Sequence, residues 1–315
     1  MDVLSTLLSE VRADGAVFAR NLLENPWALR FEDGSPLTLV VMLRGSGAVV
    51  LDDGAHRPLA EGDIAVVSGG HAFSLTDGSG DPGPARYVRG PGGTCTVEAG
   101  AASAPALASF GARTCGDAHN APNIVLTGSY DVRSPSGLRL IGALPPVLVV
   151  PDEGDLCPVM ELTVAEVERV QPGQQAVLNR LLDLLLISTL REWFAQCDED
   201  APGWYRALSD PLVGPVLRTL HDVPGETWTV SRLAEVAGVS RATLARRFAE
   251  LVGETPMAYL TTWRLSLAAD LLRTTDLTVD SIARQVGYQS GFGLSVAFKR
   301  VFGTRPSEVR RRTAA

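Results

Sequence analysis

Three arginines near the C-terminus have the chemistry and the spacing of a nucleic-acid contact. Arg241, Arg246 and Arg247 fall within the stretch "VSRATLARRF". A guanidinium group donates two parallel hydrogen bonds to O6 and N7 of guanine, and it also pairs with phosphate. Leu244 and Phe248 recur at helical spacing, which predicts a helix with one apolar and one polar face. The alternative for the arginines is a solvated charged face without a ligand.

The residues before this helix predict that it is the second helix of a helix-turn-helix. Ala234 is small, which lets two helices cross closely, and Gly238 tolerates the positive φ that the turn needs. Ser240 is a favourable N-cap for the helix that follows. Together these residues indicate a helix-turn-helix unit over residues 229–251.

The same pattern occurs a second time about 50 residues later. Six positions of the first unit coincide with six of the second: Ala234, Gly238, Leu244, Phe248, Gly253 and Pro256 with Ala283, Gly287, Leu294, Phe298, Gly303 and Pro306. The offset grows from 49 to 50, so the second turn, near Gln289, has one extra residue. The second unit therefore covers residues 278–302. The long helix predicted between the units would let them enter successive major grooves on one face of DNA.

The segment from about 209 to 312 resembles the DNA-binding domain of the AraC/XylS family of transcription regulators. The pieces "LAEVAGVSRATLARRF" and "IARQVGYQSGFGLSVAFKRVFGTRPSEVR" carry the resemblance. The preceding part resembles the cupin-like regulatory domain of one AraC subgroup through "GDIAVVSGGHAF" and "LPPVLVVP". The resemblance implies that the C-terminal domain binds double-stranded promoter DNA, and that the N-terminal domain senses a small-molecule effector and dimerises.

In the first unit the resemblance places Ala242, Ala245 and Arg246 at base-facing positions. Arg246 is the expected main reader, because the two alanines offer at most a contact with a thymine methyl group. The DNA contacts predicted for this unit are Ser240, Arg241, Ala242, Thr243, Ala245, Arg246 and Arg247.

The second unit departs from the family pattern. Gly291, Phe292 and Val296 match positions where the family often has polar readers, and none of them donates a side-chain hydrogen bond. We expect this unit to position the protein rather than to specify sequence. Phe292 either contacts a thymine methyl or completes the core. The predicted contacts are Gln289, Ser290, Gly291, Phe292 and Ser295, with charge from Lys299, Arg300 and Arg305.

The charge of the chain is divided between its two parts. The net charge is −8, which by itself does not suggest a nucleic-acid binder. Residues 209–315, however, contain 14 of the 28 Lys and Arg but only 10 of the 36 Asp and Glu, a balance of +4, whereas residues 1–208 carry −12. The C-terminal third therefore has the sign that phosphate attracts.

The first half of the chain has the pattern of a β-rich domain. Between residues 35 and 150, short Val-rich runs alternate with Gly, Pro and Asp, which predicts a small antiparallel barrel or sandwich. We expect a multidomain fold, with an all-β, cupin-like sensing domain over residues 1–170 and an all-α double helix-turn-helix domain over residues 211–315. Inward-facing positions predicted to line an effector pocket are Val41, Leu43, Val67, His71 and Phe73.

A helix predicted between the domains has apolar residues on more than one face. Residues 171–200 are therefore expected to pack on their own domain and on a second copy, with the alternative that the helix is buried within one subunit. The residues predicted for a homodimer are Leu178, Leu181, Leu182, Leu185, Leu190 and Trp193. Residues 201–210 are polar and acidic and are expected to form a linker.

Enzymatic and metal chemistry find little support in the sequence. His71 lacks the neighbouring histidines of a metal-binding cupin, and no nucleophile elbow, P-loop or dinucleotide fingerprint occurs, so we expect neither an enzyme nor a cofactor. Cys95, Cys115 and His119 are weak candidates for a zinc site, or the thiols for a redox switch. A thiol- or metal-responsive regulator is therefore the alternative, followed by a cupin enzyme with an appended DNA-binding domain.

Secretion and membrane insertion are not expected. The N-terminal stretch has acidic groups on both sides of a short apolar run, unlike a signal peptide, and the longest apolar cluster is too short for a span. The sequence thus predicts a soluble, cytoplasmic regulator. Its effector would favour one arrangement of the domains and so alter promoter occupancy or contact with RNA polymerase.

Overall fold

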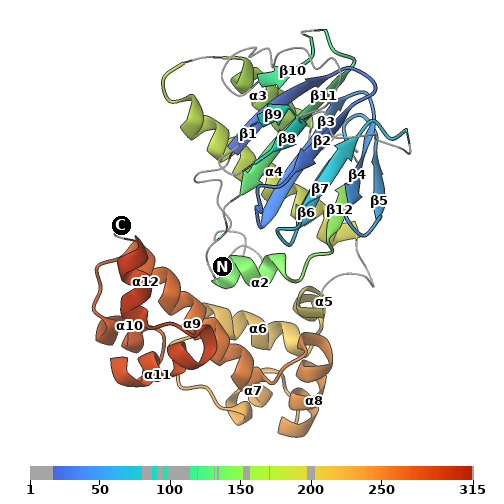
Figure 1. The fold of residues 1–315 in the computed structure, drawn as a ribbon. Helices are drawn as coiled ribbons and strands as arrows, with labels where there is room; N and C mark the ends of the chain where they lie inside the picture. Colours follow the sequence, from blue (N-terminus) through green and yellow to red (C-terminus); the bar gives the residue numbers. More distant parts are fainter. Residues whose placement is uncertain are drawn as a thin grey trace. The chain divides into compact units, whose positions relative to one another are not determined.

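The computed structural model consists of two compact units (Figure 1). One contains the strands with helices α3 (Cys157–Glu168) and α4 (Gln174–Gln196), and the other contains most of helix α2 (Pro135–Ile141) and the helices from residue 203 onward. The residues that the structure describes are 17–79, 87–90, 95–97, 114–118, 120–130, 132, 135–151, 157–169, 171–196 and 203–313.

Within the described residues, the strands form two six-stranded sheets. The first sheet has the order β10 (Thr114–Gly116), β1 (Val17–Leu23), β11 (Asn123–Tyr130), β3 (Leu37–Arg44), β6 (Ile64–Ser68) and β12 (Val147–Val150). The second has the order β5 (His56–Leu59), β4 (Gly47–Leu51), β7 (Phe73–Thr76), β2 (Ala28–Phe31), β8 (Tyr87–Arg89) and β9 (Cys95–Val97). Most neighbours are antiparallel, as the short Val-rich runs predict.

The main core of this unit joins the inner faces of both sheets. Val40 and Met42 of β3, together with Val125 of β11, pack with Phe31 and Phe73 of the second sheet. The rings of Phe31 and Phe73 stack with their centroids 4.5 Å apart. Because side chains alternate between the faces of a strand, the residues between these inward-facing ones lie on the outer face of the first sheet.

The residues predicted to line an effector pocket do not lie together on one face of the sheets. Val67 and Phe73 belong to the inner core, whereas Val41 pairs with Leu126 on the outer face, and Leu43 packs with a separate small cluster. His71 is exposed. The face of a strand residue depends on the pairing register, because a shift of one residue moves its side chain to the opposite face.

Two helices follow the last strand. They are α3 (Cys157–Glu168) and α4 (Gln174–Gln196), which contact each other, and a shorter helix, α2 (Pro135–Ile141), precedes β12. Helix α4 covers the outer face of the first sheet, where the Tyr130 hydroxyl donates to the carbonyl oxygen of Leu182 at 2.9 Å. A Cβ atom at Gly128 would lie 3.0 Å from a methyl group of Leu182, so this glycine permits the close contact.

The predicted dimerisation residues are mostly on the wrong face of α4. Five of them are buried within their own chain: Leu178, Leu182, Leu185, Leu190 and Trp193. Leu181 is half-buried, and it lies between Val177 and Leu184, which are 44% and 47% exposed. The exposed apolar stripe of α4 is therefore Val177, Leu181 and Leu184, at spacings of four and three residues.

The second unit is built of helices. They are α5 (Gly203–Ser209), α6 (Val213–Asp222), α7 (Val230–Val236), α8 (Arg241–Val252), α9 (Pro256–Thr274), α10 (Val279–Gln285), α11 (Gly291–Phe302) and α12 (Pro306–Thr313). Figure 1 shows α7 and α8 toward one end of this unit and α10 and α11 toward the other, with the long α9 between them. Over the described residues, no helix is both long and apolar enough to cross a membrane.

A helix, α5, occupies most of the segment predicted to be a linker. Ala207 is fully buried, and a Cβ atom at Gly203 would collide with the carbonyl oxygen of Leu251 at the end of α8. The polar composition of the segment hid this contact, because the two small residues allow α5 to lie against α8 without a large apolar face.

Candidate DNA-binding surface

The two helix-turn-helix units share the same caps and turns. Thr229 and Thr278 cap the first helices, α7 and α10, because each side chain accepts the backbone N–H group three residues later. Ser240 and Ser290 cap the second helices, α8 and α11, in the same way. The turns contain Gly238 and Gly287 with φ of 66° and 88°, and α8 and α11 end at Gly253 and Gly303 in the left-handed region. The internal repeat predicted from the sequence is therefore present in the backbone.

Helix α8 presents a polar face opposite its core. Leu244 and Phe248 are fully buried, whereas Arg241, Ala242 and Arg246 are exposed. Ala245 and Thr243 are half-buried, and the Thr243 hydroxyl is 2.9 Å from the Ser240 hydroxyl. The two hydroxyls are thus engaged in the cap of α8.

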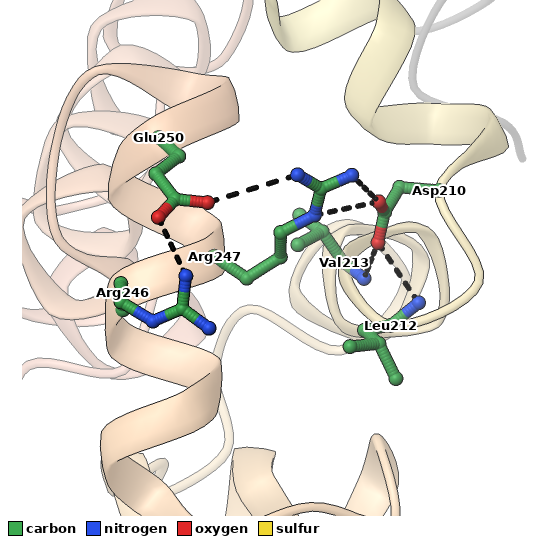
Figure 2. Close-up of polar contacts among 6 residues, drawn as sticks. All are labelled: Asp210, Leu212, Val213, Arg246, Arg247 and Glu250. Carbon is green, nitrogen blue, oxygen red and sulfur yellow. Dashed lines mark hydrogen bonds and ion pairs between the residues drawn. The ribbon is translucent and has the colours of Figure 1, made fainter.

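Arg246 and Arg247 are adjacent and both lie within ion-pair distance of Glu250, but Arg247 also pairs with Asp210 (Figure 2). Arg246 pairs with Glu250 one helical turn away, at 2.8 Å, and both side chains are largely exposed. Arg247 donates from Nε and Nη2 to Oδ2 of Asp210, at 3.0 and 2.7 Å. Asp210 lies 37 positions earlier in the chain, and its side chain is only 6% exposed. The expected role of Arg247 in DNA binding therefore competes with an ion pair that joins α8 to the start of α6.

The Asp210 carboxylate is also the cap of α6. Its Oδ1 accepts the backbone N–H groups of Leu212 and Val213, both at 2.9 Å (Figure 2). Burial acts to raise the pKa of Asp210, but the hydrogen bonds from Val213, Arg247 and Leu212 outweigh it, so that the pKa lies below its ordinary value. The hydrogen bond with Asp210 raises the pKa of Arg247 in turn.

Helix α11 has an apolar outer face in place of the polar face of α8. Phe292 is 80% exposed and Val296 is 55% exposed, so Phe292 does not complete the core. Gln289, Lys299, Arg300 and Arg305 are also exposed. The Ser295 hydroxyl donates to the carbonyl oxygen of Gly291 at 2.7 Å, within the helix.

Gly291 is buried and belongs to the frame of the unit rather than to its outer surface. Its backbone N–H donates to Oδ1 of Asp280 at 2.7 Å, and a Cβ atom at Gly291 would lie 2.8 Å from that oxygen. A polar reader at this position would therefore displace Asp280 from the start of α11. The contact accounts for the glycine where the family pattern has a side chain.

A groove opens beside α11. Its volume is about 480 Å³, and it is bounded by α11 and by residues at the starts of α10 and α12: Val279, Asp280, Gly291, Phe292, Ser295, Val296, Lys299, Arg305, Pro306 and Ser307. The groove thus combines apolar surface with two cations.

Arg264 of the long helix α9 contacts both the loop before the first helix-turn-helix unit and the turn of the second. Its Nε donates to the carbonyl oxygen of Pro224 at 2.7 Å, and Nη2 donates to that of Glu226 at 2.6 Å. A Cβ atom at Gly287 would lie 2.7 Å from this guanidinium group, so the turn of the second unit packs directly on it. Burial lowers the pKa of Arg264, but a guanidinium group remains charged. The loop before the first unit and the turn of the second thus share one anchor.

Asp210, Asp280 and Arg264 were missed by the sequence reading. Asp210 had a local signal, since an Asp before Pro211 is typical of the start of a helix. Arg264 had none, because its partners lie 38 and 40 positions away. The contact between Asp280 and Gly291 also had no local signal, because the two residues are eleven positions apart.

The metal and thiol candidates are not assembled in the described residues. Cys95 is half-buried in β9, and the backbone of Cys115 is in β10. The side chain of Cys115 and the whole of His119 fall outside the described residues. Among the side chains that the structure does describe, no three His, Cys, Asp or Glu groups are placed to hold a metal ion.

Comparisons with known proteins cover both units. The chain matches the cupin family over residues 2–195 and a helix-turn-helix domain family over residues 233–312. An AraC-like transcription regulator of Streptomyces lividans is 32% identical over 317 residues, which cover 99% of this chain and 98% of its own length. The regulator AlkR of Acinetobacter baylyi is 28% identical over 99% of this chain and 100% of its own length. The solved DNA-binding domain of AdpA, in complex with a target DNA, is 36% identical, covers 33% of this chain and 93% of its own, and has a TM-score of 0.32.

The relatives match along nearly the whole chain and are named as transcription regulators, so the expectation of a regulator rather than an enzyme is confirmed. The β-rich first unit and the helical second unit agree with the two families that match them, which confirms the expected fold class. The chain belongs to the AraC family of DNA-binding transcription regulators, with an N-terminal cupin domain and a C-terminal helix-turn-helix domain that binds double-stranded DNA.

Proposed function

We propose that the chain binds its promoter with both helix-turn-helix units and reads base sequence mainly with Arg246. The difference between Arg246 and Arg247 carries this proposal. Arg246 is exposed, and its pair with Glu250 is a surface ion pair that is worth about 0–1 kcal/mol. A guanine can therefore replace Glu250 at small cost. Arg247 would have to leave the nearly buried Asp210 carboxylate, so we assign it to the structure of the domain.

The other predicted contacts divide by what their side chains are free to do. Arg241, Gln289, Lys299, Arg300 and Arg305 are exposed and can reach phosphate. The hydroxyls of Ser240, Ser290 and Ser295 form hydrogen bonds with the backbone of their own helices. These side chains would therefore support DNA binding by fixing the helix backbone and not by contacting DNA. We retain Ala242, Thr243 and Ala245 as neighbours of the base edges and not as readers.

The reader assignment is tested with DNA duplexes that the full chain enriches from a random library. Arg246→Ala is expected to flatten base preference at one position, with a loss of about 1–3 kcal/mol for the preferred base. Arg247→Ala is the matched neighbour and should retain the preference of the unchanged chain. Equal binding of a panel of single-base variants by the unchanged chain and by Arg246→Ala would contradict the assignment.

We also propose that the regulator is a homodimer joined through α4. The side chains of Val177, Leu181 and Leu184 form an apolar stripe that faces solvent. Their spacing of four and three residues is typical of a helix that packs against another helix. A second copy of α4 would cover it with residues of the same kind.

The effector remains a proposal supported by the cupin family match. A small molecule that binds one arrangement of the regulator more tightly than another would shift promoter occupancy by that difference in affinity. Contact with RNA polymerase at the promoter is part of the same proposal. Val67 and Phe73 belong to the inner core, whereas Val41 and Leu43 of β3 lie on the outer face of the sheet, so the predicted pocket residues supply no common lining for the effector.

A further inference from the structure

The exposed apolar residues of α11 form a stripe with a cation at its end. Phe292, Val296 and Lys299 are spaced by four and three residues, so they lie on one face of the helix. Phe292 is 80% exposed and Val296 is 55% exposed, which is unusual for large apolar groups of a water-facing helix. All three line the same groove, to which Arg305 adds a second cation.

This arrangement has a definite chemical complement in DNA. In the major groove, thymine carries a C5-methyl group, which is the apolar feature of the base edges, and phosphates border the groove. Apolar side chains contact this methyl, whereas lysine and arginine neutralise phosphates. The stripe and its cations thus match a run of thymine methyls bordered by a phosphate.

The dimensions agree with this match. Side chains four residues apart on a helix have Cβ atoms about 5–6 Å apart. Successive bases on a strand are spaced by about 3.4 Å, so Phe292 and Val296 span about two base steps. No hydrogen-bond donor is needed at Gly291, whose place is fixed by Asp280.

We propose that the second helix-turn-helix unit reads the C5-methyl groups of thymine with Phe292 and Val296, while Lys299 and Arg305 hold the adjoining phosphates. This inference rests on the proposed DNA binding by both helix-turn-helix units. It assigns sequence specificity to the second unit, which lacks the polar base-contacting side chains of the family pattern. The feature recognised is the methyl group, so 5-methylcytosine satisfies the stripe where cytosine does not.

The test uses duplexes that the full chain enriches from a random 40-base-pair library. Each thymine is replaced in turn by deoxyuridine, which removes the methyl and keeps base pairing. Two or more neighbouring replacements are expected to weaken binding about fourfold each, from the loss of one buried methyl. Phe292→Ala should lose the response to deoxyuridine at one of these positions and keep it at the position read by Val296. A duplex with a 5-methylcytosine–guanine pair at the same positions should be bound more tightly than a duplex with a cytosine–guanine pair there.

Val301→Ala is the matched control, because Val301 is 41% exposed on the same helix and does not line the groove. It should retain the full response to deoxyuridine. An enriched duplex that binds equally with thymine or deoxyuridine overturns the methyl inference and leaves DNA binding intact. If Phe292→Ala lowers transcription but not duplex affinity, the stripe serves a protein partner and the inference is also overturned. Failure to enrich any duplex would instead contradict the proposed function.

Discussion

Asp210 performs two tasks with one carboxylate. One oxygen caps the start of α6 and the other holds Arg247 on α8, so the residue joins the helix before the first helix-turn-helix unit to the second helix of that unit. The hydrogen bonds that lower its pKa are present only in the folded chain. The residue therefore links the stability of the helical unit to pH.

The sign of this linkage follows from the direction of the shift. A carboxylate whose folded pKa is lowered stabilises the fold above its unfolded pKa, and the contribution is lost as the pH falls through the folded pKa. Asp210→Asn keeps a capping side chain but removes the charge. We expect it to cost about 0.5–1 kcal/mol at pH 7, because Arg247 is partly exposed and solvent screens the pair.

Thermal unfolding followed by circular dichroism measures this effect. Asp210→Asn should lower the midpoint by a few degrees at pH 7, and the difference should shrink below pH about 4. Asp276→Asn removes the same charge from an exposed position between α9 and α10 and serves as the control. A difference of the same size at pH 7 and pH 3 would exclude the charge as its cause.

The helix α4 shows how an element can be predicted while its face is assigned wrongly. The sequence predicted a helix with apolar groups on more than one side, and this is what the structure has. The buried side was taken for the dimer surface because large leucines and a tryptophan dominate it. The sheet that α4 covers is formed by strands distant in sequence, and no local pattern reports it.

The dimer proposal predicts the effect of one charge on the exposed stripe. Light scattering of the unchanged chain should give about twice its mass of 33.4 kDa. Leu184→Glu should give the mass of one chain, because an unpaired carboxylate at the seam opposes contact with a second copy. Leu184 is 47% exposed, so the substitution leaves the domain folded.

Gln175→Glu is the matched control, since Gln175 is exposed on the other side of α4 from the stripe. It should behave like the unchanged chain. A Leu184→Glu variant that keeps the doubled mass would move the interface elsewhere, and an unchanged chain of single mass would end the dimer proposal.

The elements of the helix-turn-helix domain were easier to predict than those of the cupin domain. Caps and turns are local, so Ser240 and Gly238 mark the structure within a few residues of themselves. The same holds for the repeat. Strand register is set by partners far along the chain, which is why Val41 was assigned to the wrong side of β3. On α8, the exposed position of Arg246 was predictable from the helical spacing, whereas the ion pair of Arg247 depends on the distant Asp210.

At the scale of the whole regulator, the relation between its two helix-turn-helix units matters most. Arg264 holds the loop before the first unit and supports the turn of the second. Loss of this anchor should leave each unit able to enter a groove but should weaken their simultaneous fit. We therefore expect Arg264→Ala to bind a duplex with both contact segments about tenfold more weakly.

A duplex in which one contact segment is scrambled separates this effect from general damage. Arg264→Ala should bind it within about twofold of the unchanged chain, because only one unit is engaged. Arg273→Ala, also on α9 and paired there with Asp270, should behave as the unchanged chain on both duplexes. Equal losses on both duplexes would mean that Arg264 supports folding and not the spacing of the units.

The measurement that tests the central claim most directly is a hydroxyl-radical footprint of the full chain on an enriched duplex. Two groove-entering units held by α9 should protect two segments on one face of the DNA, separated by about one helical turn of 10 base pairs. The protection should weaken steeply with salt, because phosphate contacts contribute to it. A single protected segment, or two on opposite faces, would contradict the twin-unit account.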